Sequence, residues 1–248
     1  MLSRTASWQR STNLWAIACT VVVASAILQA QPNTEVSDRS FSRFTSRTDQ
    51  PIREYRAFRR MHAYIEGQTR EAWMTAWTEL RNGQMSYEIV SEHGSESIRN
   101  RVLHTVLARE QELVNSGKAA RSELTADNYV FTDGGRDATG AHFVLIKPRR
   151  SDVNLVDGRA VLSENGDLVR VEGKLSKNPS FWTSLVNIVR HYARVAGFRV
   201  PVATETTARM RFLGVARLDV IYDYQSINGR ALALSGRRSE GLSRTAER

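Results

Sequence analysis

Five histidines are the side chains of this sequence best suited to acid–base or metal chemistry. They are His62, His93, His104, His142 and His191. No two of them form a His-Glu-x-x-His motif or share one helix face at metal-binding spacing. The single cysteine, Cys19, lies in an N-terminal apolar run, so a zinc site in the body of the chain would need histidines and carboxylates alone. The sequence therefore predicts no metal site and no cofactor.

Motifs for nucleophilic or phosphate chemistry are also missing. The sequence contains no G-x-S-x-G elbow, no P-loop and no glycine-rich dinucleotide loop. Residues 133–137 (DGGRD) superficially resemble a calcium-binding loop. They lack alternating oxygen ligands and a closing glutamate, which favours a hairpin turn. A Ser-His-Asp triad assembled only in space stays open as an alternative. We expect no catalytic residue and a protein that is not an enzyme.

The first thirty residues have the pattern of a secretory signal peptide. Arg4 and Arg10 form a basic start, residues 14–28 are uncharged and apolar, and small residues lead to Ala30. We expect residues 1–30 to be cleaved and the protein to be periplasmic or otherwise exported. The alternative is a retained N-terminal anchor helix. No second long apolar run follows, so no integral membrane span is expected after cleavage.

Composition divides the remaining chain into three parts. Residues 31–50 are rich in serine, threonine, asparagine and aspartate, which predicts a polar, partly disordered arm in which Phe41 and Phe44 dock locally. Residues 51–229 form the expected folded domain. Residues 230–248 are polar and basic, typical of a disordered tail.

The chain carries a formal net charge of +9. Its arginines are dispersed, and the densest basic spots are residues 147–150 and 174–177. Export would remove nucleic acid from reach, so we expect no nucleic-acid partner. An anionic lipid or envelope partner and a merely solvated surface both fit the charge.

Period-two patterns dominate the expected domain. Residues 209–224 alternate apolar and polar side chains on both sides of Gly214, which predicts two strands divided by a turn or bulge. Shorter strands are predicted at 86–90, 129–131, 142–147 and 168–171, and turns at 82–83, 134–135, 165–167 and 228–229. Such an arrangement indicates a mainly β (α+β) fold with an antiparallel sheet.

One segment has helical spacing and another is ambiguous. Between Ser95 and Ser116 the apolar residues recur every three or four positions, Ser95 suits an N-cap and Gly117 can end the helix. A lone amphipathic helix beside a large sheet must cover apolar sheet surface. Residues 182–195 fit both a helix and a strand.

Several phrases together resemble a known group of proteins. They are YRAFRRMHA (55–63), AWMTAWTEL (72–80), EHGSESIRNRVL (92–103), KPRRSDVNLVDG (147–158), LVRVEGKLSKNPSFW (168–182) and residues 197–229. They resemble exported, largely uncharacterised bacterial proteins with a fold like that of the periplasmic outer-membrane lipoprotein carrier (LolA-like). The resemblance implies a curved antiparallel half-barrel with one or more helices on its concave face. It also favours a strand at 182–195.

The resemblance suggests where a ligand would lie, although no carrier residue matches one for one. A curved sheet with an apolar inner face is filled by its own helices or by a guest. The residues expected to line that face are Trp73, Met74, Trp77, Phe143, Leu145, Met210, Phe212 and Tyr222, and those expected at its rim are Phe181 and Trp182. The same residues also fit an ordinary packed core, and the pattern does not separate the two.

From these features we expect a periplasmic, monomeric, non-catalytic binding protein. It would shield a lipid or a lipidated partner in an apolar half-barrel, in the manner of an outer-membrane lipoprotein carrier. The alternative is an envelope sensor or scaffold that binds another protein through the surface of its sheet.

Overall fold

A computed structural model describes residues 34–181, 183–211 and 214–232 of the 248-residue chain. The predicted signal peptide, Trp182 and Phe212 lie outside the described residues, as does most of the predicted tail. The helical elements are α1 (Thr34–Ser46), α2 (Glu96–Ile98), the π-helical turn η1 (Arg99–Leu103), α3 (His104–Asn115) and the 3-10 turn η2 (Ala119–Ser122). The strands are β1 (Tyr55–Ile65), β2 (Glu71–Arg81), β3 (Gln84–Gly94), β4 (Tyr129–Arg136), β5 (His142–Pro148), β6 (Val156–Leu162), β7 (Leu168–Leu175), β8 (Thr183–Val195), β9 (Phe198–Met210), β10 (Gly214–Ile227) and β11 (Arg230–Ala231).

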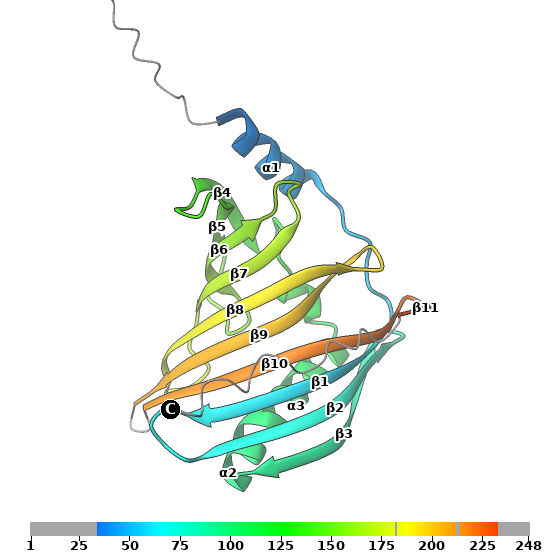
Figure 1. The fold of residues 1–248 in the computed structure, drawn as a ribbon, viewed down its shortest axis with the longest axis vertical. Coiled ribbons are helices and arrows are strands. Elements are labelled where there is room, and N and C mark those ends of the chain that lie inside the picture. Colours follow the sequence, from blue (N-terminus) through cyan, green and yellow to red (C-terminus); the bar gives the residue numbers. More distant parts are fainter. Residues whose placement is uncertain (1–33, 182, 212–213, 233–248) are drawn as a thin grey trace, which may run out of the picture. The chain divides into compact units, whose positions relative to one another are not determined.

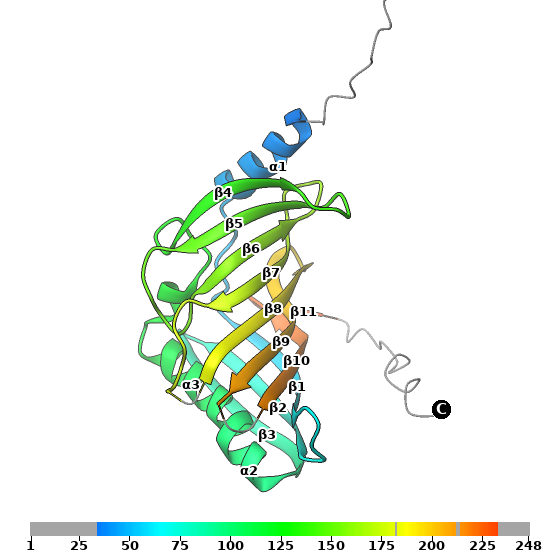
Figure 2. The ribbon, with the colours of Figure 1, turned by 90° about the vertical axis from the view of Figure 1, so that its left-hand side faces the viewer.

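These strands form one open, curved antiparallel sheet (Figure 1). The strand order is β3-β2-β1-β10-β9-β8-β7-β6-β5-β4, with β11 paired to β10. The two edge strands, β3 and β4, are consecutive in the chain, so the segment between them must cross from one edge of the sheet to the other. That segment contains α2, η1 and α3, which pack on the concave face (Figure 2). The expected mainly β fold with a helix on the concave face is confirmed.

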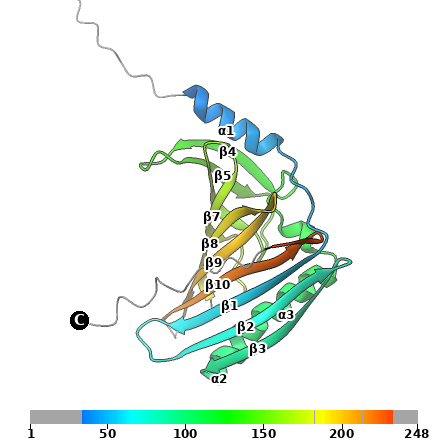
Figure 3. The same ribbon diagram turned by 45° about the vertical axis from the view of Figure 1, so that its right-hand side comes forward.

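The face that carries α2, η1 and α3, here called the inner face, is lined by small residues beneath the helix. Ala57, Ala63, Ala72 and Ala76 are all but completely buried there. Ile98, Leu103 and Leu107 of the helical segment pack in one cluster with Ala63, Ala72 and Ala76. Figure 3 shows α3 beside β1, β2 and β3. Alanine at these positions lets the helix approach the strands closely enough for tight packing.

The buried core forms three clusters on the inner side. One lies under the helical segment, with Met61 and Met74 facing each other across β1 and β2. A second, around Val144 and Ile146, lies on β4–β7. A third, around Phe198 and Ile227, lies at the ends of β8–β10 and β1. The middle strands β8 and β9 lie between the first two clusters in the sheet.

Helix α1 corrects the prediction of a polar arm. Phe44 is buried in the β4–β7 cluster and meets Phe131 edge to face, with ring centroids 5.6 Å apart. Ser40 donates a hydrogen bond to the carbonyl of Glu164, and Arg47 pairs with Asp167. Phe41 and Phe44, the two residues expected to dock locally, both pack on this cluster, and two aromatic side chains within a polar sequence are enough to dock a helix. Beyond the domain predicted at 51–229, β11 adds two residues of the expected tail to the sheet.

The turn predictions succeed except at residues 133–137. Asn82-Gly83 and Asn228-Gly229 adopt positive φ, as tight hairpins require. The DGGRD segment is instead a bulge at the end of β4, and the turn follows it at Asp137–Gly140. A side chain at Gly134 would collide with the ring of Phe143, so the glycine serves close packing inside the strand.

The ambiguous segment is a strand and the helical prediction is confirmed. Residues 183–195 form β8, paired along most of its length with β9. Residues 96–115 are helical, with Ser95 at the N-terminal boundary and Gly117 at positive φ beyond the end. Gly214 begins β10 just after β9, as the alternation predicts.

Candidate functional site

An ion pair anchors the helix to the middle of the inner face. Arg59 of β1 is 3% exposed, and its guanidinium donates two hydrogen bonds to the carboxylate of Glu110 on α3. The Nη1–Oε2 distance is 2.5 Å and the Nη2–Oε1 distance is 2.8 Å. Burial would lower the pKa of Arg59, but Glu110 outweighs it and the pKa is raised. Burial likewise opposes ionisation of Glu110, and Arg59 reverses this, so the pKa of the carboxyl is lowered. Both groups are charged in the folded protein.

Tyrosines surround this pair. Arg59 Nη2 donates to the hydroxyl of Tyr55 at 3.3 Å, and its guanidinium lies 4.8 Å from the ring centroid of Tyr222. Tyr224 stacks edge to face on Tyr55, and burial raises the pKa of its hydroxyl well above the ordinary value. A neutral phenol supplies hydrogen bonds without adding charge, so this aromatic shell solvates the ion pair.

A second arginine faces the same region from β8. Arg190 pairs in register with Val171 and Thr204, both inner-face residues. It is exposed to water, yet burial is the largest influence on the pKa of its guanidinium. Because its register places Arg190 on the inner face, this exposed guanidinium is open to solvent on the concave side of the sheet. Tyr192, Tyr222 and Glu110 outweigh burial and raise its pKa.

Together these side chains form what we call the arginine–tyrosine cluster. Its members are Tyr55, Arg59, Glu110, Arg190, Tyr192, Tyr222 and Tyr224. It lies between the apolar cluster under the helix and the apolar cluster on β4–β7, where Tyr222 and Tyr192 pack at the respective margins. Next to it on the inner face, Ile188, Thr206 and Leu218 are only half-buried. This part of the concave face is left partly uncovered.

Two polar atoms of this region lack a hydrogen-bond partner. Thr204 is 7% exposed and its Oγ1 is unpaired. The Nε of Arg59 is buried and unpaired as well. Leaving a buried donor unpaired costs about 1–3 kcal/mol, so a water molecule or a polar group of a ligand would be stabilised at either atom.

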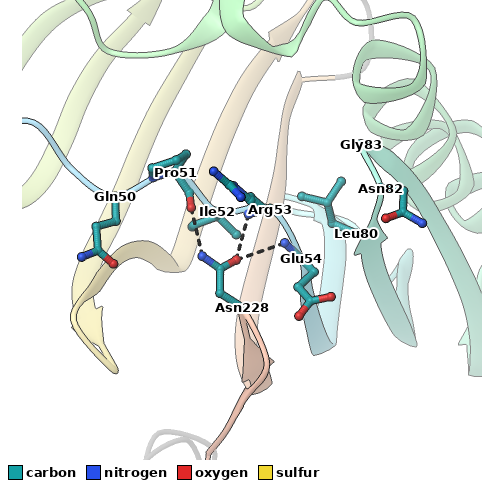
Figure 4. Close-up of a pocket in the computed structure, with 9 residues that line it drawn as sticks. All are labelled: Gln50, Pro51, Ile52, Arg53, Glu54, Leu80, Asn82, Gly83 and Asn228. Carbon is teal, nitrogen blue, oxygen red and sulfur yellow. Dashed lines mark hydrogen bonds between the residues drawn. The ribbon is translucent and has the colours of Figure 1, made fainter.

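A pocket opens at one end of the cluster. Its volume is about 890 Å³ and its walls come from the segment before β1 and from the β2–β3 and β10–β11 turns (Figure 4). Asn228 holds that segment, because its Oδ1 accepts from the amides of Arg53 and Glu54 and its Nδ2 donates to the carbonyl of Pro51. Leu80 lines the pocket and is the register partner of Tyr55. The pocket therefore adjoins the cluster.

The predicted lining residues divide between the two faces. Trp73 and Trp77 alternate with the buried alanines of β2 and so lie on the outer face, as do Phe143 and Leu145 of β5. They do not line the concave face, which corrects the prediction. The period-two pattern defines two faces without saying which is inner, and the larger aromatic set of β2 is the outer one because the helix requires small residues.

Three predicted residues are on the inner side. Met74 is fully buried under the helix, Tyr222 belongs to the cluster, and Met210 ends β9 with its sulfur 3.7 Å from Thr183 Oγ1. Of the rim pair, Phe181 is 70% exposed and carries Arg211 over its ring, while Trp182 lies outside the described residues, as does Phe212.

Sequence reasoning missed the charged members of the site. Arg59 lies on the same strand face as Ala57 and Met61, two residues away on either side. Arg190 likewise shares the face of Ile188 and Val186. A charge on the apolar face of a strand is costly unless it is paired, so each position carried a signal of its own. Glu110 had no such signal, because acidic residues are common on helices.

The histidines lie elsewhere, mostly beside single carboxylates. The pairs are His62–Glu71, His104–Glu92, His142–Asp133 and His191–Glu205. On the outer face Trp73 is sandwiched between His62 and His93, with ring centroids 4.7 and 4.8 Å away. Within the described residues no three His, Cys, Asp or Glu side chains gather as metal ligands. In the same part of the chain, no helix has the length and apolar character of a membrane span.

Comparison with known proteins gives a likeness in structure alone. No family model and no curated protein matches the chain. Among solved structures, it is similar to a LolA superfamily protein from Nitrosomonas europaea, with 10% sequence identity and a TM-score of 0.35. The overlap covers 82% of this chain and 96% of that chain. At this level of similarity, function has to be inferred from the residues of the inner face themselves.

Proposed function

We propose that this protein is an exported, non-catalytic binding protein that shields the apolar part of a lipid or lipidated partner against its concave face. The observation that carries the proposal is the partly uncovered inner surface between the two apolar clusters. Ile188 and Leu218 are only half-buried there, although they lie on the side of the sheet that forms the core. Covering such surface is favourable by about 25 cal/mol per Å².

The adjoining pocket supports the same function. Its volume of about 890 Å³ falls within the range of small-molecule sites, which is about 300–1,000 Å³. Its lining is mixed: Ile52 and Leu80 are apolar, whereas most of the other side chains are polar. We propose that the apolar portion of the ligand lies over the half-buried strand residues and that this pocket receives at most one end of it.

A matched pair of substitutions tests binding on the concave face. Thr206 and Thr207 are neighbours on β9, both half-buried, with Thr206 on the inner face and Thr207 on the outer face. Thr206→Trp fills the uncovered surface and is expected to abolish binding of the neutral fluorescent probe 1-N-phenylnaphthylamine. Thr207→Trp is expected to leave binding unchanged. Absence of probe binding by the wild-type protein, or equal binding by both variants, refutes the proposal.

Export is proposed from the N-terminal sequence alone. Full-length chain expressed in a bacterial host with an outer membrane is expected to appear in the periplasmic fraction, with Gln31 as its first residue. Retention in the membrane fraction with residues 1–30 intact would support the anchor alternative.

A second function, protein binding through the outer face of the sheet, is favoured by the stack around Trp73. Tyr64, His62, Trp73 and His93 form a continuous row of stacked rings across β1–β3. Aromatic side chains are enriched in protein interfaces. An envelope protein retained by the delipidated wild type and lost from Trp73→Ala, with probe binding intact, would establish this function.

A further inference from the structure

We propose that the ligand is an anionic amphiphile and that Arg190 binds its carboxylate or phosphate headgroup on the concave face. This inference rests on the proposed function and specifies the chemistry of its ligand. It follows from the charges, the unpaired atoms and the positions of the residues around Arg190.

The cluster has an excess of positive charge. It contains two guanidinium groups, of Arg59 and Arg190, and one carboxylate, of Glu110. The hydrogen bonds of the Glu110 carboxylate go to Arg59. Its influence on Arg190 is Coulombic. A guanidinium has five N–H donors, so Arg190 keeps donors for a planar or tetrahedral anion.

Neutral hydrogen-bonding groups flank that guanidinium. Tyr192 and Tyr222 both lie near enough to Arg190 to raise the pKa of its guanidinium. Thr204 is its register partner on β9, and the side chains of directly opposed residues begin only about 5 Å apart. The unpaired Thr204 hydroxyl can donate to an anion held by Arg190. This arrangement resembles a built anion site more than a surface charge, because Thr204 is only 7% exposed.

The apolar surroundings then orient the rest of the ligand. Ile188 and Thr206 lie one step along β8 and β9 from Arg190 and Thr204, with Leu218 beyond them on β10. An anion at Arg190 places a hydrocarbon chain over these half-buried residues or towards the pocket beside Tyr55. Both paths remain on the concave face.

Three single-chain amphiphiles of equal length distinguish the headgroups. Dodecanoate, dodecyl phosphate and dodecanol compete with 1-N-phenylnaphthylamine for the full-length mature protein. We expect at least one of the two anions to displace the probe about tenfold or more better than the alcohol. The stronger of the two identifies the headgroup as a carboxylate or a phosphate.

Arg190→Met tests the residue, and Arg209→Met serves as the control because Arg209 is exposed on the outer face of β9. The inner-face variant is expected to weaken anion binding about 10- to 100-fold, the loss of one charge-assisted contact, and to leave dodecanol unchanged. Arg190→Lys should recover part of the loss. If the probe binds but the alcohol competes as well as both anions, or Arg190→Met weakens all three ligands equally, the headgroup assignment is wrong while the proposed function stands. If the probe does not bind the wild type, the proposed function itself fails.

Discussion

Replacing Glu110 with glutamine should destabilise the protein by about 2–3 kcal/mol. The change keeps the shape of the side chain but removes the carboxylate bonded to Arg59, whose guanidinium is 3% exposed. The amide has one acceptor oxygen, so one of the two Nη bonds is replaced by a contact between donors. Removing one partner of a fully buried ion pair costs about 3–5 kcal/mol. We take a lower value because Glu110 is 35% exposed and water partly screens it.

The measurement is urea denaturation followed by circular dichroism, with the double variant Arg59→Met/Glu110→Leu as the matched control. Replacing both charges removes the unpaired ion, so the double variant should lie within about 1 kcal/mol of the wild type. A Glu110→Gln variant whose free energy of unfolding stays within about 0.5 kcal/mol of the wild type would refute the assigned role of the pair.

The same variant should alter the acid sensitivity of the fold. Arg59 lowers the pKa of Glu110 in the folded state against the opposing effect of burial. A carboxyl with a lowered folded pKa contributes stability above its unfolded pKa and loses that contribution as the pH falls through the folded value. The stability difference between wild type and Glu110→Gln should therefore shrink below about pH 4.5, the ordinary pKa of glutamate. A difference that is constant from neutral to strongly acid pH contradicts the geometry.

Two further predictions concern the sheet and its N-terminal helix. Gly158→Ala should destabilise the fold by about 2–3 kcal/mol, because the added Cβ would lie 2.1 Å from the carbonyl oxygen of Glu172 on β7 and 2.6 Å from the Cα of Gly173, its register partner. Equal thermal stability of variant and wild type would show that these strands do not approach so closely. Phe44→Ala should cost about 2–4 kcal/mol and release α1 from β4, since the ring is buried against Phe131. Limited proteolysis should then cut at residues 47–54 faster than in the wild type, and an unchanged rate would contradict the docking.

Local chemistry made much of the fold predictable. Asn82-Gly83 and Asn228-Gly229 predict hairpins because both residues of such turns need positive φ. The 3.6-residue period of Ile98, Val102 and Val106 predicts the helix, since its stripe has to be buried. Phe41 and Phe44 predict that the arm docks, but the helix and the strand that it contacts were not predictable, because they depend on where Phe44 meets a distant part of the chain.

The faces of the strands show where pattern analysis stops. Alternation in β2 separates Trp73 and Trp77 from Ala72 and Ala76. The large size of the tryptophans suggested that they line the inner face, and this was wrong. The inner set is small because a helix occupies that face, which is a tertiary fact absent from the strand itself. Large aromatic side chains on a strand therefore do not identify the concave face when a helix covers it.

Charged residues within an apolar alternation are more informative. Arg59 and Arg190 each occupy a position where alternation demands an inward side chain, and an inward arginine has to find a partner or a ligand. Arg59 forms an ion pair with Glu110, which holds α3 over β1. Arg190 lies near the phenols of Tyr192 and Tyr222 and is exposed to water. The nearby carboxylate of Glu110 is hydrogen-bonded to Arg59. The two arginines therefore differ in role: both Nη atoms of Arg59 are bonded to a carboxylate within the fold, whereas Arg190 is the exposed guanidinium to which we assign the ligand headgroup.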